Sequence, residues 1–284
     1  MSAVPPRLPD VLGAESTAFT QTVDARWLMA YAGGLGEDDA RFYDTLAAGG
    51  PVVHPVFPVC YEWPPLVDLR ERTIGPALAP LSVHATHDCS ITRMPHAGEC
   101  VTTRARVIAI EPRRAGALLV ARLTTTGPDG AVLTTTDYGS VYRGVESTTP
   151  GRLEPPLSPA SPPPAAPAWS EPVEVRAEAA HVYTECARIW NPIHTDIAVA
   201  RAAGLPAIIL HGTATLALGI SRVVRRELNG DAARVRRLAA RFTGFVRLPS
   251  ALVVRGRGRA GTSIAFDIVA ADGTPVLGEG VVTV

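Results

Sequence analysis

The sequence predicts an α+β protein in which one unit, a curved antiparallel sheet around a central helix, is built twice. Three observations support this fold class. A proline-rich segment divides the 284 residues near their middle, the two flanks carry similar motifs in the same order, and the second flank pairs one long apolar helix with a run of strands.

The composition is that of a globular protein, with 46% hydrophobic and 19% charged residues and a formal net charge of zero. A nucleic-acid-binding protein would normally carry a basic domain or stripe, so we expect no nucleic-acid partner. The N-terminus lacks the basic and apolar segments of a signal peptide, and the apolar run 207–220 is too short and mixed to span a bilayer. We therefore expect a cytoplasmic protein with no membrane partner.

The boundary between the two predicted domains is the segment 147–170, which reads STTPGRLEPPLSPASPPPAAPAWS. A stretch so rich in proline cannot continue a helix or a central strand, and we expect an extended spacer. The predicted organisation is an N-terminal domain over residues 1–146, a linker over 147–170 and a C-terminal domain over 171–284.

The two flanks resemble each other, which indicates duplication. Each ends in an Asp-Gly turn followed by a β-rich strand, in GPDGAVLTTTDYGSVY and in AADGTPVLGEGVVTV. Earlier, VVHPVFP in the first half corresponds to ILHGTAT in the second, and MAYAGGLGEDD corresponds to HVYTECARIWNP. The offset between partners is roughly half the chain in every case.

The second half predicts three helices, over 178–187, 197–203 and about 211–228. Asp196 is a suitable N-cap for the middle one, and Asn229-Gly230 ends the longest. The apolar residues of the longest helix cover a wide face, so we expect other structure to wrap it. Strands are predicted over 238–246, 251–258, 263–270 and 275–284.

The first half departs from this pattern where its central helix should lie. Pro55, Pro58, Pro64 and Pro65 fall there, and proline inside a helix costs about 3 kcal/mol or more. We therefore expect a short or broken central helix in this half, which leaves room beside it for an acyl chain.

The candidate chemistry lies in Trp190-Asn191-Pro192-Ile193-His194-Thr195-Asp196 and in the His211-Gly212 pair. His194 titrates near neutral pH and is a candidate general acid or base, while Asn191 both donates and accepts hydrogen bonds. Gly212 opens the long helix, where free N–H groups favour negative charge. A purely structural role for His194, and a capping or packing role for His211, stay open.

The motif N-P-I-H-T-D, followed by A-x-x-A-G-L-P and I-L-H-G, resembles the MaoC-like dehydratases, also called (R)-specific enoyl-CoA hydratases. The first half is similar to the non-catalytic domain of fused members through Tyr31-Ala32, Gly36-Glu37-Asp38-Asp39 and His54-Pro55-Val56-Phe57-Pro58. The resemblance implies a double hotdog fold and reversible addition of water to a 2-enoyl thioester.

It also implies the roles of three residues. The histidine matching His194 acts on the catalytic water together with an aspartate, and Asn191 orients that water. Gly212, preceded by His211 in the substrate-binding pair, gives its N–H to the thioester carbonyl.

One departure bears directly on the mechanism. The family's aspartate stands two residues before the asparagine, where this chain has Ile189, which cannot transfer a proton. Three explanations stay open. Glu185, one helical turn earlier, substitutes for it; His194 works alone; or the site has turned to isomerisation, cyclisation or acyl binding without turnover.

Two further clusters contain residue types that occur in binding sites. Six arginines around the end of the long helix suit a phosphate or an acidic carrier protein, or form a solvated face: Arg222, Arg225, Arg226, Arg234, Arg236 and Arg237. His84, His87, Asp88 and Cys89 include metal-ligand types without zinc-site spacing, so we expect no metal and no cofactor. The expected partners are an acyl-CoA or acyl-carrier-protein thioester and a second copy of the chain as a homodimer.

Overall fold

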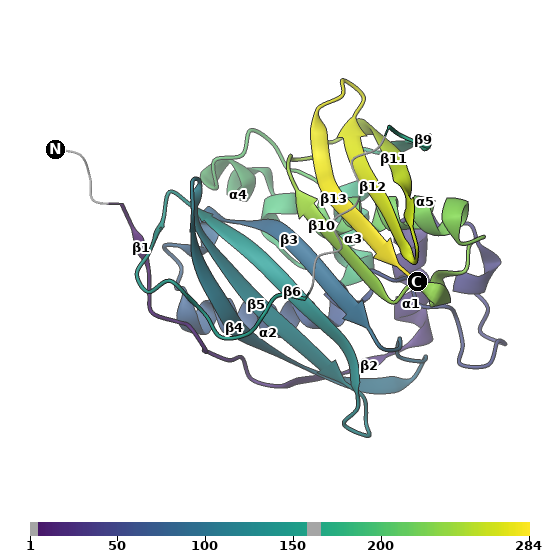
Figure 1. The fold of residues 1–284 in the computed structure, drawn as a ribbon, viewed down its shortest axis with the longest axis horizontal. Coiled ribbons are helices and arrows are strands. Elements are labelled where there is room, and N and C mark those ends of the chain that lie inside the picture. The colour runs from purple at the N-terminus through teal and green to yellow at the C-terminus, as the bar shows by residue number, and fades with distance from the viewer. Residues whose placement is uncertain (1–4, 158–165) are drawn as a thin grey trace.

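The computed structural model describes residues 5–157 and 166–284. One long sheet dominates the molecule, with the strands in front and the principal helices behind them in Figure 1. Its strands follow the order β2-β4-β5-β6-β3-β10-β13-β12-β11-β9, and the pairs along this path are antiparallel. The short strand β8 pairs beside β4. This is the α+β double hotdog architecture predicted from the sequence.

Each half contributes five strands to that path. The first half supplies β2 (Phe19–Val23), β3 (Ser82–Ile91), β4 (Glu99–Arg113), β5 (Gly116–Thr126) and β6 (Val132–Arg143). The second supplies β9 (Trp169–Val175), β10 (Arg237–Phe242), β11 (Ser250–Ala260), β12 (Ser263–Ala270) and β13 (Pro275–Thr283). When the strands are numbered within each half, both halves have the same spatial order, as expected for a duplication.

The helices also repeat. The first half contains α1 (Ala25–Gly34), the 3₁₀ helix η1 (Ala40–Phe42) and α2 (Pro58–Thr73). The second contains α3 (Ala179–Ala187), η3 (Pro192–His194), α4 (Ile197–Ala202) and α5 (Gly212–Glu227). Two further 3₁₀ turns, η2 (Ala79–Leu81) and η4 (Ala232–Arg234), precede β3 and β10. Within the described residues no helix is long and apolar enough to cross a membrane.

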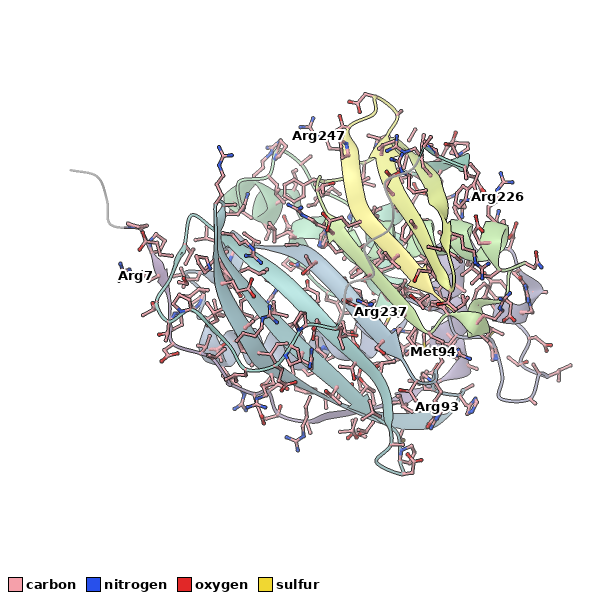
Figure 2. The ribbon with its side chains drawn as sticks, in the orientation of Figure 1. Arg7, Arg93, Met94, Arg226, Arg237 and Arg247 are labelled. Atoms are coloured by element: carbon pink, nitrogen blue, oxygen red, sulfur yellow. The ribbon has the colours of Figure 1, made fainter. Side chains whose placement is uncertain are left out.

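The two halves meet along β3 and β10, where Arg237 lies opposite Ser90 and Arg241 opposite Thr86 (Figure 1). Arg237 strengthens this junction through two hydrogen bonds to the carboxylate of Asp88, with Nε–Oδ1 2.8 Å and Nη2–Oδ2 2.5 Å (Figure 2). The largest apolar cluster contains side chains from both halves. The two units therefore share one core.

The predicted elements of the second half are confirmed with shifts of a few residues at their ends. Asp196 caps α4 by accepting hydrogen bonds from the N–H groups of Ala198 and Val199. Asn229 and Gly230, both with positive φ, follow the end of α5 as predicted. β9, together with β2 in the first half, had not been predicted.

The prediction of a short or broken central helix in the first half was wrong. α2 runs without interruption from Pro58 to Thr73, with Pro64 and Pro65 inside it. Pro58 stands at the first position, where no N–H bond is required. Pro65 has no N–H to give to the carbonyl of Tyr61, but the side-chain amide of Gln21 donates to that oxygen at 2.8 Å instead. A neighbouring strand thus satisfies a carbonyl that the proline leaves free.

Part of the predicted linker, residues 158–165, lies outside the described residues. Before it, β7 (Glu146–Ser147) pairs with β1 (Arg7–Leu8), and β8 (Gly151–Arg152) pairs with β4. After it, β9 begins at Trp169 and pairs with β11.

Candidate active site

The motif residues lie on the segment that leads from the end of α3 to the start of α5. Arg188, in the left-handed conformation with φ 58°, turns the chain out of α3. Asn191 then stands directly before η3, and His194 is the last residue of that turn. The chain returns after α4 and reaches His211, which stands directly before α5. The fold thereby brings two separated parts of the motif to the same place.

His194 is buried with only 8% of its surface exposed. Its Nδ1 lies 2.8 Å from the carbonyl oxygen of Ile209, and since a carbonyl only accepts, Nδ1 carries the hydrogen. Nε2 consequently keeps its lone pair, and it has no protein partner in the described part of the chain. Burial lowers the pKa of His194 to about 4, so the ring is neutral at neutral pH.

The imidazole of His211 stacks on that of His194, with ring centroids 3.7 Å apart and planes at 25°. Its Nε2 lies 3.3 Å from the hydroxyl of Thr184 on α3, while its Nδ1 is buried without a partner among the described residues. Burial and the adjacent His194 lower the pKa of His211 well below its ordinary value. The stack fixes the orientation of His194 because His211 is itself held by α3.

Gly212 is the first residue of α5, and no side chain caps this end of the helix. The N–H groups of a first turn have no partner inside their helix and carry the positive end of its dipole. A β-carbon at Gly212 would lie 3.3–3.6 Å from atoms of the Phe242 ring, so this turn faces β10 closely. Phe242 could not be predicted to lie here, because its place beside Gly212 depends on the pairing of β10 with the rest of the sheet.

The position that corresponds to the family's aspartate holds an apolar residue, Ile189, and its surroundings are apolar as well. Ile189 is 4% exposed and belongs to the main core cluster. Glu185, which could have replaced the aspartate, lies on the exposed side of α3. Among the described residues Glu185 makes no hydrogen bond with either histidine, and its exposure favours the interpretation of a solvated helix residue over that of a substitute acid.

Asn191 is partly exposed at the start of η3, and its backbone carbonyl accepts from the N–H of His194 at 3.1 Å. Its side-chain amide has no protein partner within 5–157 and 166–284. It lies three residues before His194 in one short turn, so its amide is available to a ligand on the same side of the loop.

The arginines around the end of α5 are largely paired with acidic groups. Glu171 lies within 4 Å of Arg222, Arg225 and Arg226, and Arg225 also pairs with Asp38 at 3.4 Å. These contacts favour the interpretation of a compensated, solvated face over a phosphate site. No group of three or more potential metal ligands occurs in the described part of the chain.

The sequence comparisons match both halves. Residues 160–271 match the family described as "MaoC like domain", and residues 10–136 match the "FAS1-like, dehydratase domain region". The chain is 34% identical over 128 residues, 45% of its length, to the enoyl-CoA hydratase ChsH3 of Mycobacterium tuberculosis. It is 38% identical over 53 residues, 19% of its length, to a peroxisomal enoyl-CoA hydratase 2 of Arabidopsis thaliana. The matched segments span 44% and 17% of those two proteins.

Solved structures share the whole fold. A MaoC-like dehydratase from Phytophthora capsici superposes with a TM-score of 0.84 at 20% identity, over 95% of both chains. The peroxisomal multifunctional enzyme type 2 of Drosophila melanogaster gives 0.78 at 22% identity, over 95% of this chain and 48% of that one. A Mycobacterium tuberculosis protein described as a double hotdog fold gives 0.63 at 15% identity, over 96% and 95%. The chain therefore contains a MaoC-like domain over residues 160–271 and a FAS1-like dehydratase region over residues 10–136, and it has the double hotdog fold of the solved structures.

Proposed function

We propose that the protein catalyses the reversible addition of water to a 2-enoyl thioester, with His194 as the single acid–base group. The observation that carries the proposal is the juxtaposition of His194 and the first turn of α5. The imidazole with its free Nε2 stacks on His211, the residue directly before Gly212. A general base and an oxyanion donor therefore stand side by side.

In the hydration direction, Nε2 of His194 takes a proton from water as its oxygen bonds to C3 of the enoyl group. The electron pair moves to the thioester oxygen, which the N–H of Gly212 stabilises as an enolate. The imidazolium then returns its proton to C2, and the thioester carbonyl re-forms. Asn191 holds the water through its side-chain amide, and dehydration follows the same steps in reverse.

The carrier on the thioester, coenzyme A or an acyl carrier protein, is part of the proposed substrate. The named relatives that are enoyl-CoA hydratases support the coenzyme A form. We further propose that the first half binds the acyl chain, that the chain acts in the cytoplasm and that two copies form a homodimer.

The proposal is tested by following the ultraviolet absorbance of crotonyl-CoA with the wild-type protein and with His194→Ala. The substitution should lower kcat/KM by about 10²–10⁴-fold, because it removes the proton acceptor. His96→Ala, an exposed histidine of the first half, is the matched control and should retain the wild-type rate. Equal rates for wild type and His194→Ala, or no hydration by the wild type, would contradict the proposal.

A second candidate is a protein that binds acyl thioesters or rearranges them without adding water, and buried Ile189 favours it. Ile189→Asp distinguishes the two. A large gain in hydratase activity would show a degenerate hydratase site, whereas loss of an existing activity would show chemistry adapted to isoleucine. Ile189→Asn is the matched control, because asparagine has the shape of aspartate but no ionisable proton. Both variants place a polar side chain in the core and should lower the free energy of unfolding by about 1–3 kcal/mol or more.

A further inference from the structure

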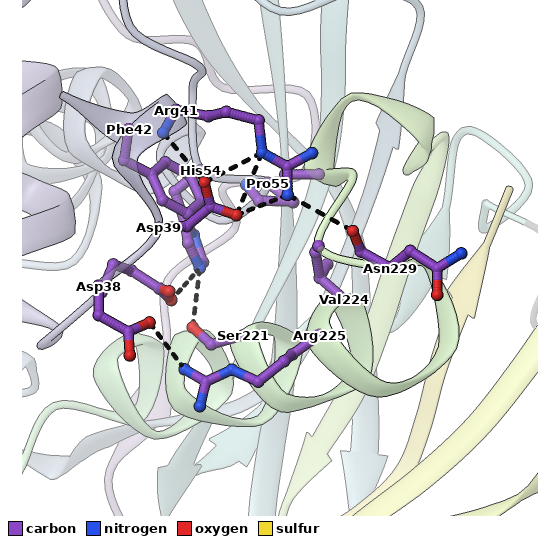
Figure 3. Close-up of a pocket in the computed structure, with 13 residues that line it drawn as sticks. Asp38, Asp39, Arg41, Phe42, His54, Pro55, Ser221, Val224, Arg225 and Asn229 are labelled. Atoms are coloured by element: carbon purple, nitrogen blue, oxygen red, sulfur yellow. Dashed lines mark hydrogen bonds and ion pairs between the residues drawn. The ribbon is translucent and has the colours of Figure 1, made fainter. Parts of the chain in front are cut away.

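A second candidate site lies in the first half, at the position related by duplication to the His194 site. A cavity of about 430 Å³ is enclosed by residues after α1, by His54 and Pro55, and by the C-terminal half of α5 (Figure 3). Ligand sites in proteins typically have volumes of about 300–1,000 Å³. None of the motif residues Asn191, His194 or Gly212 lines this cavity.

The two sites correspond residue by residue. η1 begins after Asp39 as η3 begins after Asn191, and the third residue of each turn, Phe42 or His194, packs on the histidine before the central helix. Two residues before each cap stand Glu37 and Ile189. The first half therefore has an acid where the second has isoleucine, and a phenylalanine where the second has its base.

The hydrogen bonds of His54 fix its tautomer. The N–H of Val56 donates to Nδ1 at 3.1 Å, so Nε2 carries the hydrogen and donates to Oγ of Ser221 at 3.2 Å. Ser221 in turn donates to the carbonyl of Ala217 at 2.9 Å. In Figure 3 the His54 ring and the Ser221 hydroxyl point toward one another across the cavity. The Nε2 hydrogen of His54 is thus donated to Ser221 and is not available to Glu37.

This arrangement leaves one oxygen of Glu37, Oε1, without a hydrogen-bond donor in the described part of the chain. Its side chain is 7% exposed, and Oε1 lies 3.8 Å from Nε2 of His54, too far for a hydrogen bond. Oε1 is buried with no partner within the described residues. Burial raises the pKa of Glu37, although the hydroxyl of Ser221 and the positive charges of Arg222 and Arg225 oppose that effect.

The other charges that line the cavity are matched. Asp39 pairs with Arg41 at 2.5 Å, and Asp38 pairs with Arg225 at 3.4 Å (Figure 3). Glu37 is the remaining carboxyl group of the lining. The rings of Phe42 and His54, 6.0 Å apart between centroids, form a wall beside it. A carboxyl beside aromatic faces is the setting in which proteins bind organic ammonium groups.

The same surroundings argue against hydratase chemistry in this half. The N–H of Val56 is bonded to His54, and Pro58 at the start of α2 has no N–H, so the helix start offers fewer donors than that of α5. An enolate formed here would lack the stabilisation that Gly212 provides in the second half.

We propose that this cavity is a second binding site, for a small organic ligand with an ammonium group that donates hydrogen bonds to Glu37. This inference does not depend on the hydratase proposal. The ligand would restore the missing donor, and Glu37, Phe42 and His54 would be its principal contacts.

The probe is benzylammonium, compared with benzyl alcohol and benzoate in ligand-observed NMR and calorimetric titrations of the full chain. The wild type should bind benzylammonium with a Kd of about 1 mM or below, and at least about tenfold more tightly than either comparison compound. Glu37→Gln should lose at least that tenfold preference. Asp38→Asn, which removes a largely exposed carboxylate of the same lining, is the matched control and should keep it.

Glu37→Met provides a second variant of similar length without polar atoms, and its thermal unfolding reports whether the fold is retained. Both Glu37 variants should stay folded and lose benzylammonium. Undetectable binding by the wild type, equal binding of the three compounds, or retained binding in both folded Glu37 variants would each overturn the proposal.

Discussion

At the residue scale, one backbone carbonyl decides what His194 can do. The oxygen of Ile209 accepts the Nδ1 hydrogen, which leaves the opposite nitrogen as a base. Burial lowers the pKa of the imidazole and keeps it neutral, so it is ready to accept a proton but is a weak base. In a hydratase with His194 as its single acid–base group, the rate acceleration therefore depends more on holding the water and the substrate in position than on the basicity of the imidazole.

A second residue-scale feature is Glu62 on α2, which is 3% exposed and accepts a hydrogen bond from Thr136 at 2.7 Å. Burial raises its pKa from 4.5 to about 8, so the folded protein keeps this proton over a range in which the unfolded chain loses it. The contribution of Glu62 to stability is thus fully present below about pH 4.5 and is lost as the pH rises toward about 8.

We predict that Glu62→Gln becomes more stable relative to wild type as the pH rises from 5 to 8, because glutamine does not ionise. The change should be on the order of 3 kcal/mol in the free energy of unfolding, measured by urea denaturation at both pH values. Glu71→Gln, an exposed residue of the same helix, is the control. A difference between Glu62→Gln and wild type that does not vary with pH would show that Glu62 ionises freely in the folded state.

At the scale of elements, α5 lies against the sheet at Gly219. A β-carbon there would be 2.9 Å from atoms of both Phe266 and Ile268, two buried side chains of β12. Neither neighbour has room to move away in a packed core. This close approach holds α5, and with it the first turn that contains Gly212.

We predict that Gly219→Ala lowers the free energy of unfolding by about 1–3 kcal/mol, although alanine favours helix formation by up to about 1 kcal/mol over glycine. Gly278→Ala on β13 is the control, since its β-carbon would meet only Thr243 Cγ2, at 3.9 Å. Chemical denaturation of both variants measures the difference. Equal stabilities of Gly219→Ala and wild type would show that the helix can shift away from the sheet.

Elements whose ends are set by neighbouring residues could be predicted from the sequence. Features that depend on residues distant in the chain could not. The capping of α4 by Asp196 and the turn after α5 are local, and both were confirmed. The continuity of α2 was not predictable, because Gln21 on another strand supplies the missing donor. The motif located His194 and His211, but their stacking and the burial of Ile189 depend on tertiary packing.

At the scale of the whole molecule, five histidines have lowered pKa values. Four are buried and His84 is half-buried: His54, His84, His87, His194 and His211. Burial is the largest cause in each case. The folded protein holds these rings neutral, whereas the unfolded chain protonates them below about pH 6.5. Their contribution to stability is present above that pH and is lost as the pH falls toward the folded values of about 3 to 4 for His54, His87 and His194.

We predict that the free energy of unfolding falls steeply between pH 6.5 and 5, with uptake of several protons on unfolding. Glu62 has the opposite effect, because it releases a proton on unfolding in this pH range, but it contributes a single proton. Urea denaturation at pH 7.5, 6 and 5 measures the slope, and unfolding monitored in weakly buffered solution measures the proton uptake directly. A free energy that is constant over this range would mean that the rings are already accessible to protons in the folded protein.

The difference between the two halves at one corresponding position, Glu37 in the first and Ile189 in the second, has an evolutionary consequence. In a symmetric homodimer every substitution appears in both active sites at once, so neither site can change while the other stays as it was. Covalent joining of the copies removes that constraint, because position 37 and position 189 are encoded separately. After such joining, one site can lose an acid while the other loses a base, and the two copies of one pocket can come to bind different molecules.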